Sequence, residues 1–434
     1  MKLAEHWQIL IALVAALVLA LVLRAFDGEW VDGVVAFCQF LGKFFMNLLK
    51  MIIVPLVVSS VVVGISGLHG VQGFGRLLGK TAGFYALTSL FAIILGLALV
   101  NLIQPGLVDG QPNTEIAAAF SGNGEESAEA QKVAAAGAVG AENSGFAAQI
   151  GNFFLRMVPP NVFGAAVSNG QLLGLIFFAI CFAITMTRLP LETVKPLNGF
   201  FEAVNEVMIL LTRGIMKLAP IGVFALIVPV VYETGGSLFV SLGKYFGTVI
   251  AALLLHLFVT MPLVIWLLAR VNPLHHFRAM RTALLTAFST ASSSATLPIT
   301  LRSIQEEVGV SKKTASFTLP LGATVNMDGT ALYECIAVIF VAQVMGVEMD
   351  FAAQFMVVFS ALLTSIGVAG IPSASLVAIM IILTNSGIPN ASSAVVALLA
   401  VDRLLDMTRT AVNVFSDSCA ALVVAKSEGE TLRY

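Results

Sequence analysis

The sequence is poor in charged residues and has no excess of positive charge. Only 11% of its 434 residues are charged, against about a quarter in an ordinary soluble domain, while 58% are apolar and the mean hydropathy is +0.95. The 23 Lys and Arg residues do not outnumber the 25 Asp and Glu residues, so no basic surface for nucleic acid is predicted. These shortages argue against a soluble enzyme and a nucleic-acid-binding protein. They indicate that the surroundings of the chain are a lipid bilayer.

Cysteine is also scarce, with four residues in the whole chain. They are far apart and lie in or beside apolar runs, so neither a disulfide framework nor a CxxC zinc motif is present. We interpret them as small apolar packing residues: Cys38, Cys181, Cys335 and Cys419.

Long apolar runs are abundant. The first, residues 9–23, is followed by Arg24 rather than by a small-residue cleavage site, so it is predicted to be a retained membrane helix and not a signal peptide. Further runs are long enough to cross a hydrocarbon core of about 30 Å. They occupy residues 37–67, 81–104, 146–187, 203–231, 237–270, 314–345 and 393–425, and Pro159-Pro160 predicts that 146–187 is broken in two.

The loop charges predict an orientation. With the N-terminus in the cytoplasm, the basic residues of the loops gather on the cytoplasmic side, and little more than Arg24 and Lys132 stays outside. The polar stretch from Gly106 to Gly145 contains six carboxylates and one lysine and is predicted to be a flexible external loop. The expected location is therefore the plasma (inner) membrane, as a multi-pass protein with both termini cytoplasmic.

Two apolar segments are interrupted too early to cross the membrane. Residues 277–304 break at 291–298, and residues 351–384 break at 365–375. About twelve helical residues cover only about 18 Å, so each arm is too short to span. Two interrupted segments of opposite orientation, each followed by a spanning helix, predict re-entrant hairpins, an inverted repeat and a binding site at the membrane midplane.

The last apolar run contains polar residues on one helical face. Asp402, Asp406, Arg409, Asn413 and Asp417 are separated by four, three, four and four residues. An ionisable side chain at the bilayer centre costs about 2.5–3.5 kcal/mol on insertion scales. In the simplest structural interpretation Arg409 neutralises Asp406, which leaves Asp402 and Asp417 unexplained. We therefore favour a functional role for this face.

The preceding run contains the polar sequence Gly322 to Thr330. Its flanks are apolar, so an unwound stretch here would offer carbonyls and the Asp328 carboxylate to a hard cation. Glu334 follows one turn later and is either buried and protonated or a proton carrier. His256, alone on an apolar face, is interpreted as a packing residue. A polar patch in residues 81–104 is by itself more typical of helix packing than of a ligand set.

Four ordered motifs make the chain similar to members of the glutamate/aspartate family of dicarboxylate and amino-acid:cation symporters. They are Ser292 to Pro298, Asn326 to Thr330, Ser365 to Pro372 and Asp402 to Asp417. The resemblance covers the chain from its first apolar run to its C-terminus. It implies an all-α polytopic membrane protein with eight transmembrane helices and two re-entrant helical hairpins arranged as inverted repeats, in a homotrimer that works as an elevator.

The resemblance also implies a division of the chain. Scaffold helices occupy 1–78 and 146–232, the third helix of the transport domain occupies 79–105, and a flexible external loop occupies 106–145. The rest of the transport domain, with helix 6, hairpin 1, helix 7, hairpin 2 and helix 8, occupies 233–434, and the outer hairpin acts as the gate.

The family pattern assigns substrate contacts to this chain. Arg409 would bind the side-chain carboxylate of the substrate, Asp406 its α-ammonium, and Thr410 would line the site. The α-carboxylate would be held by the hairpin backbones, with Ile371 counted among the substrate-binding residues, and by the side chains of Asn413, Thr330 and Ser293.

The same pattern implies three sodium sites and a candidate proton carrier. The first would use Asp417 with carbonyls of Gly322, Asn326 and Asn413. The second would use Asp328 with Asn326 and the patch of Tyr85, Thr88 and Ser89. The third would use Thr324 and the carbonyls of Ser365, Ile366 and Val368. Glu334 matches the proton-carrying glutamate of animal glutamate transporters.

Together these residues predict a symporter of L-glutamate or L-aspartate and not an enzyme. Neutral amino-acid members lack an arginine at position 409, and C4-dicarboxylate members lack an aspartate at position 406. Sodium ions are the expected coupling ions, and protons are the second candidate. The alternatives are a proton-coupled glutamate or C4-dicarboxylate symporter and, from other classes, an anion channel or an intramembrane hydrolase.

Overall fold

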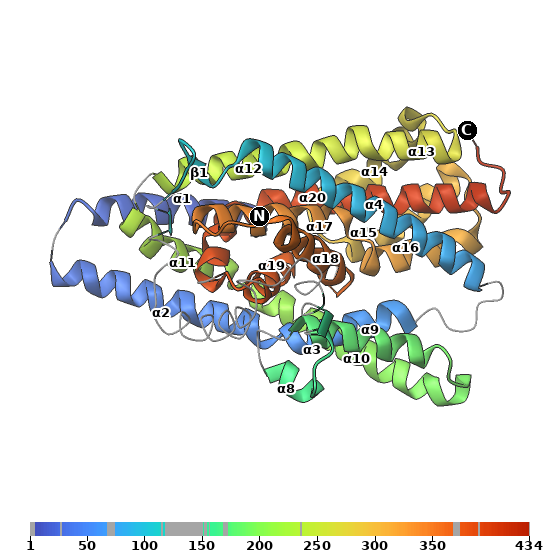
Figure 1. Ribbon diagram of the computed structural model, residues 1–434, viewed down its shortest axis with the longest axis horizontal. Coiled ribbons are helices and arrows are strands. Elements are labelled where there is room, and N and C mark those ends of the chain that lie inside the picture. Colours follow the sequence, from blue (N-terminus) through green and yellow to red (C-terminus); the bar gives the residue numbers. More distant parts are fainter. Residues whose placement is uncertain are drawn as a thin grey trace.

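The computed structural model describes residues 5–26, 28–66, 74–113, 116–117, 151, 154–155, 157–167, 172–234, 237–367, 374–388 and 391–433. This part of the chain is almost entirely helical (Figure 1). Its only strands, β1 (Leu107–Val108) and β2 (Gln111–Pro112), form a small antiparallel pair just after α4 (Phe74–Ile103). Most of the predicted external loop lies outside the described residues.

The N-terminal part contains three helices rather than two. After α1 (Glu5–Leu23), the apolar run predicted as one span over 37–67 is divided into α2 (Glu29–Met51) and α3 (Ile53–Ser66). Pro55 explains the break, because its ring collides with the carbonyl of Met51 and it has no N–H to donate. The single continuous span expected here is therefore wrong.

The span predicted over 81–104 is one continuous helix, α4, but the spans predicted over 146–187 and 203–231 are interrupted. After Pro159-Pro160 the chain forms the short α8 (Val162–Val167) and then α9 (Leu172–Met186), in line with the predicted break. The run 203–231, predicted as one span, is divided into α10 (Leu191–Met216) and α11 (Ala219–Thr234), which are bent by 56°.

The C-terminal half contains both helix pairs that the sequence predicts as hairpins. The first pair is α14 (Pro273–Thr290) and α15 (Ser293–Ser303), and the π-helical turn η3 (Ile304–Val308) follows it. The interruption was predicted over 291–298, but it covers only two residues. Ala291 turns the chain with a φ of 49°, and Ser292 caps α15 by accepting the N–H of Ala295 at 3.2 Å.

The second pair is α18 (Phe351–Gly367) and α19 (Ala374–Asn385). The interruption predicted over 365–375 is too long at both ends, because residues 365–367 belong to α18 and residues 374–375 belong to α19. Residues 368–373 lie outside the described part. Between the two pairs, the predicted unwound stretch is confirmed but is short. It consists of Asn326 and Met327, between α16 (Lys312–Val325) and α17 (Asp328–Val344).

Three further segments complete the core. The helix α12 (Ser237–Leu255) continues through the π-helical turn η2 (His256–Thr260) into α13 (Met261–Ala269). The last helix, α20 (Ala391–Ser427), runs for 37 residues through the middle of the C-terminal half (Figure 1). Helices α14, α16 and α17 pack against α20, and α4 packs along α17.

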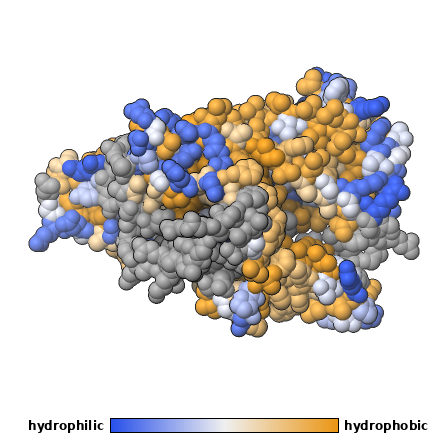
Figure 2. Space-filling view, viewed as in Figure 1, coloured by the Kyte–Doolittle hydropathy of each residue, from blue (hydrophilic) through white to orange (hydrophobic). Residues whose placement is uncertain are grey.

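The outer surface is that of a membrane-embedded protein. Figure 2 shows a broad hydrophobic surface over α12 and α13, with hydrophilic residues on both sides of it along the long axis. Large apolar side chains such as Phe258, Leu263 and Trp266 are more than half exposed on it. By length and composition, three described helical segments can each cross a membrane, and the bent pair of α10 and α11 could provide a fourth crossing. The number of eight transmembrane helices stays a prediction.

Candidate functional site

Buried charge is concentrated in α17 and α20. Five carboxylates and two guanidinium groups on these helices are each at most 7% exposed: Asp328, Glu334, Asp402, Asp406, Asp417, Arg403 and Arg409. The buried carboxylates thus exceed the buried guanidinium groups by three. Burying an uncompensated charge is costly, so this arrangement favours the uptake of cations, protons or both.

Arg409 is the centre of the first polar cluster. Its guanidinium group forms an ion pair with Asp406, one turn earlier on α20, and lies 3.5 Å from Asp402. Its Cζ atom lies 4.6 Å from the centre of the Tyr333 ring, and the Tyr333 hydroxyl donates to Oδ1 of Asp402 at 3.1 Å. Thr410 contacts the same turn, since its hydroxyl donates to the backbone carbonyl of Asp406 at 2.7 Å.

This geometry corrects the interpretation that pairing with Arg409 leaves Asp402 unexplained. Asp402 shares Arg409 with Asp406, so one cation serves two carboxylates. A second cation, Arg403, lies 3.8 Å from Asp406 and was not among the residues singled out in the sequence. Of the acidic residues of α20, only Asp417 has no guanidinium group within ion-pairing distance in the described part of the chain.

Asn413 joins this cluster to the break in the preceding helix. Its Oδ1 accepts the N–H of Gly329 at 2.9 Å, and its Nδ2 donates to the hydroxyl of Thr330 at 3.1 Å. The first turn of α17 leaves backbone N–H groups without helical partners, which is why a side chain from α20 can bind there. Two residues predicted to hold the α-carboxylate, Asn413 and Thr330, are thus in direct contact.

The second polar cluster surrounds Asp417. Asn326, in the break, donates its amide to Oδ1 of Asp417 at 2.9 Å. Gly322 packs so closely that an added Cβ atom would lie 2.7 Å from the Tyr85 hydroxyl and closer still to the Asp417 carboxylate. The structure therefore brings Tyr85, Gly322, Asn326 and Asp417 together from α4, α16, the break and α20.

Asp328 has a partner that the sequence analysis overlooked. Its Oδ1 accepts the N–H of Gly329 at 2.9 Å, and its Oδ2 lies 3.0 Å from Nε2 of His256. Both side chains are fully buried. His256 was interpreted as a packing residue, and it is fully buried and hydrogen-bonded. The sequence did not reveal that its partner is the carboxylate predicted to bind a cation. An ionisable side chain in the middle of an apolar span was the signal that could have identified it.

Glu334 is fully buried on α17, one helical turn after Thr330. Its Oε2 accepts the hydroxyl of Thr364 in α18 at 2.7 Å, whereas Oε1 has no hydrogen-bond partner among the described residues. This carboxyl group therefore lies between α17 and α18, the first helix of the second pair.

Several predicted residues are not brought into hydrogen bonds with either cluster. The hydroxyls of Thr88, Thr324 and Ser365 donate to carbonyls of their own helices, and Ser89 is buried on α4. Ser293 is buried at the start of α15, where no described hydrogen bond connects it to Arg409. The backbone of Ile366 belongs to α18, whereas Val368 and Ile371 lie outside the described residues.

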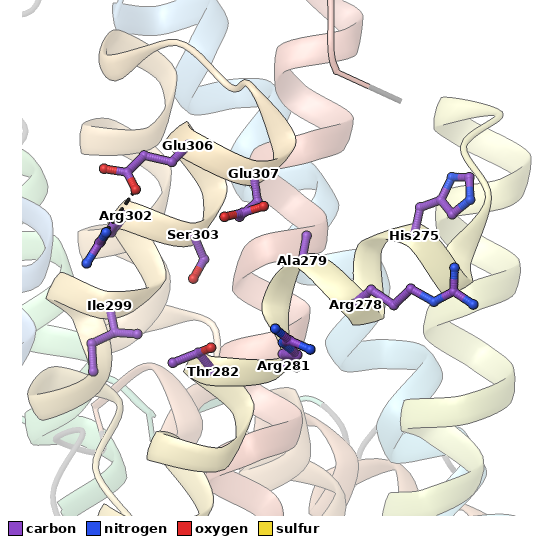
Figure 3. Close-up of a pocket in the computed structure, with 10 residues that line it drawn as sticks. All are labelled: His275, Arg278, Ala279, Arg281, Thr282, Ile299, Arg302, Ser303, Glu306 and Glu307. Atoms are coloured by element: carbon purple, nitrogen blue, oxygen red, sulfur yellow. Dashed lines mark hydrogen bonds and ion pairs between the residues drawn. The ribbon is translucent and has the colours of Figure 1, made fainter.

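A separate hollow of about 770 Å³ lies between α14 and α15, away from both clusters (Figure 3). Arg278 and Arg281 of α14 line one side of it, and Arg302, Glu306 and Glu307 line the other, where Arg302 donates to Glu306 at 2.8 Å (Figure 3). Charges of both signs along the wall largely compensate one another. The hollow therefore has no strong field of one sign, and it contains none of the predicted site residues.

Tyr333 and Thr364 are further site residues that the sequence analysis missed. Each is a neutral residue in an apolar run, so nothing in the pattern distinguishes it from a packing residue. Their positions at Asp402 and Glu334 depend on how α17 packs against α20 and α18.

Comparisons with known proteins identify the family of the chain. The chain is 34% identical over 429 residues to a proton/sodium-glutamate symport protein of Bacillus caldotenax, covering 99% of this chain and 96% of the relative. It is 34% identical to a proton/glutamate-aspartate symporter of Escherichia coli, with 98% and 93% covered, and 36% identical to human excitatory amino acid transporter 2, with 92% and 75% covered. The sequence pattern of the sodium:dicarboxylate symporter family matches residues 6–427, and the chain belongs to that family.

Proposed function

We propose that this protein is a secondary active symporter that imports L-glutamate and L-aspartate, driven by sodium ions and protons. The observation that carries the proposal is the position of Arg409 beside Asp406 in a buried region with three more carboxylates than guanidinium groups. Such a region can accept the carboxylate and ammonium groups of an amino acid and also requires cations for charge balance.

The Arg409 cluster provides the substrate contacts. Arg409 binds the side-chain carboxylate of the substrate, because its planar guanidinium group can donate two parallel hydrogen bonds. Asp406, freed from that guanidinium group, binds the α-ammonium, and Thr410 lines the site. Asn413, Thr330, Ser293 and Ile371 hold the α-carboxylate. The direct contact between Asn413 and Thr330 supports this set.

Sodium ions are cargo of the transporter and bind at oxygen-rich sites around the break. Asp417 with Gly322, Asn326 and Asn413 forms one site, and the close approach of Gly322 to Asp417 supports it. A second site uses Asp328 with Asn326 and three residues of α4: Tyr85, Thr88 and Ser89. A third uses Thr324 of α16 with the carbonyls of Ser365, Ile366 and Val368. Glu334 carries the proton.

The names of the relatives support both coupling ions. The Bacillus relative is named a proton/sodium-glutamate symport protein, and the Escherichia relative a proton/glutamate-aspartate symporter. The chain covers nearly the full length of both, so the resemblance includes the helices that contain the two clusters and Glu334.

The proposal includes a two-domain elevator in a homotrimer. Eight transmembrane helices and two re-entrant hairpins cross or enter the inner membrane, with both termini in the cytoplasm. Packing supports a division into two domains, since α1, α2 and α11 pack together and α3 packs against α9 and α10. The scaffold comprises 1–78 and 146–232, and the transport domain comprises 79–105 and 233–434, where α4, α14, α16, α17 and α19 pack against α20.

Uptake of labelled glutamate and aspartate into proteoliposomes tests the proposal, with an inward sodium gradient and an inward proton gradient imposed separately. We expect glutamate and aspartate to accumulate against their concentration gradients when an inward sodium gradient is imposed. Accumulation should be faster when an inward proton gradient is added. Accumulation driven by the proton gradient alone would show that the proposed sodium sites are wrong. Only downhill flux would indicate an anion channel, and chemical conversion of the substrate would indicate an enzyme.

A further inference from the structure

His256 lies where the helix formed by α12 and α13 changes its hydrogen-bonding pattern. It is the first residue of the π-helical turn η2 and is 0% exposed, although the neighbouring Phe258 and Val259 are more than half exposed. Single π-helical turns within α-helices occur frequently at functional sites. Here the turn directs one ionisable side chain into the core, toward the first residue of α17.

The chemistry of the contact defines its direction. A carboxylate that binds a cation is ionised and can only accept, so in that state the 3.0 Å contact is a hydrogen bond from Nε2–H of His256 to Oδ2 of Asp328. The other ring nitrogen, Nδ1, is buried with no hydrogen-bond partner among the described residues. A neutral imidazole protonated at Nε2 fits this environment, because an imidazolium would have a second N–H buried without an acceptor.

The Asp328 carboxylate is held from two sides. Oδ1 accepts the N–H of Gly329 at 2.9 Å, and Oδ2 accepts the hydrogen bond from His256. Each oxygen has a further lone pair, so the carboxylate can still bind a cation after both contacts are made. A neutral donor orients the carboxylate without adding a positive charge that would repel an alkali cation.

We infer that His256 is a positioning residue for cation binding, which acts by orienting Asp328 toward a sodium ion. The inference rests on the proposed function, because it takes Asp328 to be a sodium ligand. Groups that hold a metal ligand through a hydrogen bond typically change metal affinity by about 10- to 100-fold when they are removed. In this role His256 acts through Asp328 and is not itself a ligand of the sodium ion or of the substrate.

Substitutions that separate the donor from the ring test this role. His256→Gln keeps an N–H near the position of Nε2, whereas His256→Leu fills the space and removes the donor. His256→Asn keeps a polar group but places its N–H too far from Asp328, so it serves as a second donor-free variant if the leucine variant does not fold. Val259→Ala, on the exposed side of the same turn, is the matched control.

Two readouts are measured for each variant. The first is the sodium concentration that gives half-maximal glutamate uptake, together with the glutamate KM at saturating sodium. The second is the thermal stabilisation of the purified protein by NaCl relative to choline chloride, because an ion that binds only the folded state raises its stability. We expect the leucine and asparagine variants to need at least about 10-fold more sodium. The glutamate KM should not change, and the glutamine and Val259 variants should resemble the wild type.

An unchanged sodium requirement in the donor-free variants would overturn the inference. So would an equal loss in the glutamine variant, since that would indicate a role for the ring itself in packing. If the wild type does not accumulate glutamate with sodium, the proposed function fails separately. The stabilisation by NaCl then decides the inference, which is wrong if wild type and His256→Leu respond equally.

Discussion

Arg409 lies 3.5 Å from the carboxylate of Asp402, two turns earlier on α20, while it also forms an ion pair with Asp406. One guanidinium group is therefore shared by two buried carboxylates. A substrate carboxylate that binds Arg409 must compete with at least one of them. Release of Asp406 by this competition would leave it ready for the α-ammonium of an amino acid, which links recognition of the two ends of the substrate.

Replacement of Arg409 by alanine should abolish uptake of acidic amino acids. Loss of a buried charged partner of a carboxylate typically costs 2–5 kcal/mol or more, which corresponds to a loss of affinity of at least about 30-fold. We also expect preference to shift to neutral amino acids, because Asp406 can still bind the α-ammonium. Uptake of labelled glutamate and of labelled alanine, each measured in the wild type and in the variant, reports both effects.

The same variant leaves Asp402 and Asp406 without their shared cation. Arg409→Lys is the appropriate control, because it keeps the positive charge and loses the planar fork. It should fold and show intermediate glutamate affinity. Undiminished glutamate uptake by Arg409→Ala would remove the assignment of an acidic substrate.

Tyr333→Phe should weaken glutamate binding without changing the dependence on sodium. The ring that packs under Arg409 remains, but the hydrogen bond to Asp402 is lost, which typically costs about 0.5–1.5 kcal/mol. We expect a KM about 3- to 10-fold higher at saturating sodium. Tyr232→Phe on α11 is the control, and an unchanged KM for Tyr333→Phe would reduce Tyr333 to a packing residue.

Glu334→Gln should flatten the pH dependence of uptake. Glutamine can keep the contact with Thr364, but it cannot gain or lose a proton during the transport cycle. Initial uptake rates in proteoliposomes from about pH 5.5 to 8 measure the effect, because a carboxyl group that carries a proton must gain and lose it within the pH range in which the transporter works. Glu348→Gln, at an exposed position, should retain the wild-type profile. If Glu334→Gln also retains it, Glu334 has a structural role only.

Glu430 makes stability depend on pH at the C-terminal end of the chain. Burial raises the pKa of its carboxyl, but hydrogen bonds from Thr314 and from the backbone and hydroxyl of Ser311 lower it more, so the pKa lies below its usual value. A carboxylate whose pKa is lower in the folded protein stabilises it above the pKa of the unfolded chain, about 4.3. That stabilisation is lost as the pH falls through the folded-state pKa.

Glu430→Gln should therefore lower the unfolding temperature at pH 7. On acidification, the unfolding temperature of this variant should decrease less than that of the wild type. The loss of charge-assisted hydrogen bonds corresponds to a decrease of about a few degrees. Thermal unfolding of detergent-solubilised protein from pH 7 down to about pH 3.5 covers the window. Glu348→Gln should follow the wild type, and an identical acid-induced decrease in Glu430→Gln would show that this carboxylate does not contribute.

The helical membrane character, the two interrupted segments of the C-terminal half and the polar face of the last apolar run can be predicted from local sequence alone. These features depend on local composition, on proline and glycine positions and on the cost of charge in hydrocarbon, which act along a single stretch of chain. The spacing of Asp402, Arg409 and Asp417 on one helical face follows from the helical repeat alone. The breaks were predicted too long, because serine capping lets α15 start at Ser293.

The pairing of the buried polar groups depends on how the helices pack. The contacts of His256 with Asp328 and of Tyr333 with Asp402 join residues 72 and 69 positions apart, and they exist because α12 and α17 pack around α20. A histidine or tyrosine in an apolar run has the same local pattern whether it packs or binds. Its role depends on which buried charge the fold places opposite it, because the cost of leaving that charge unpaired is specific to the folded chain.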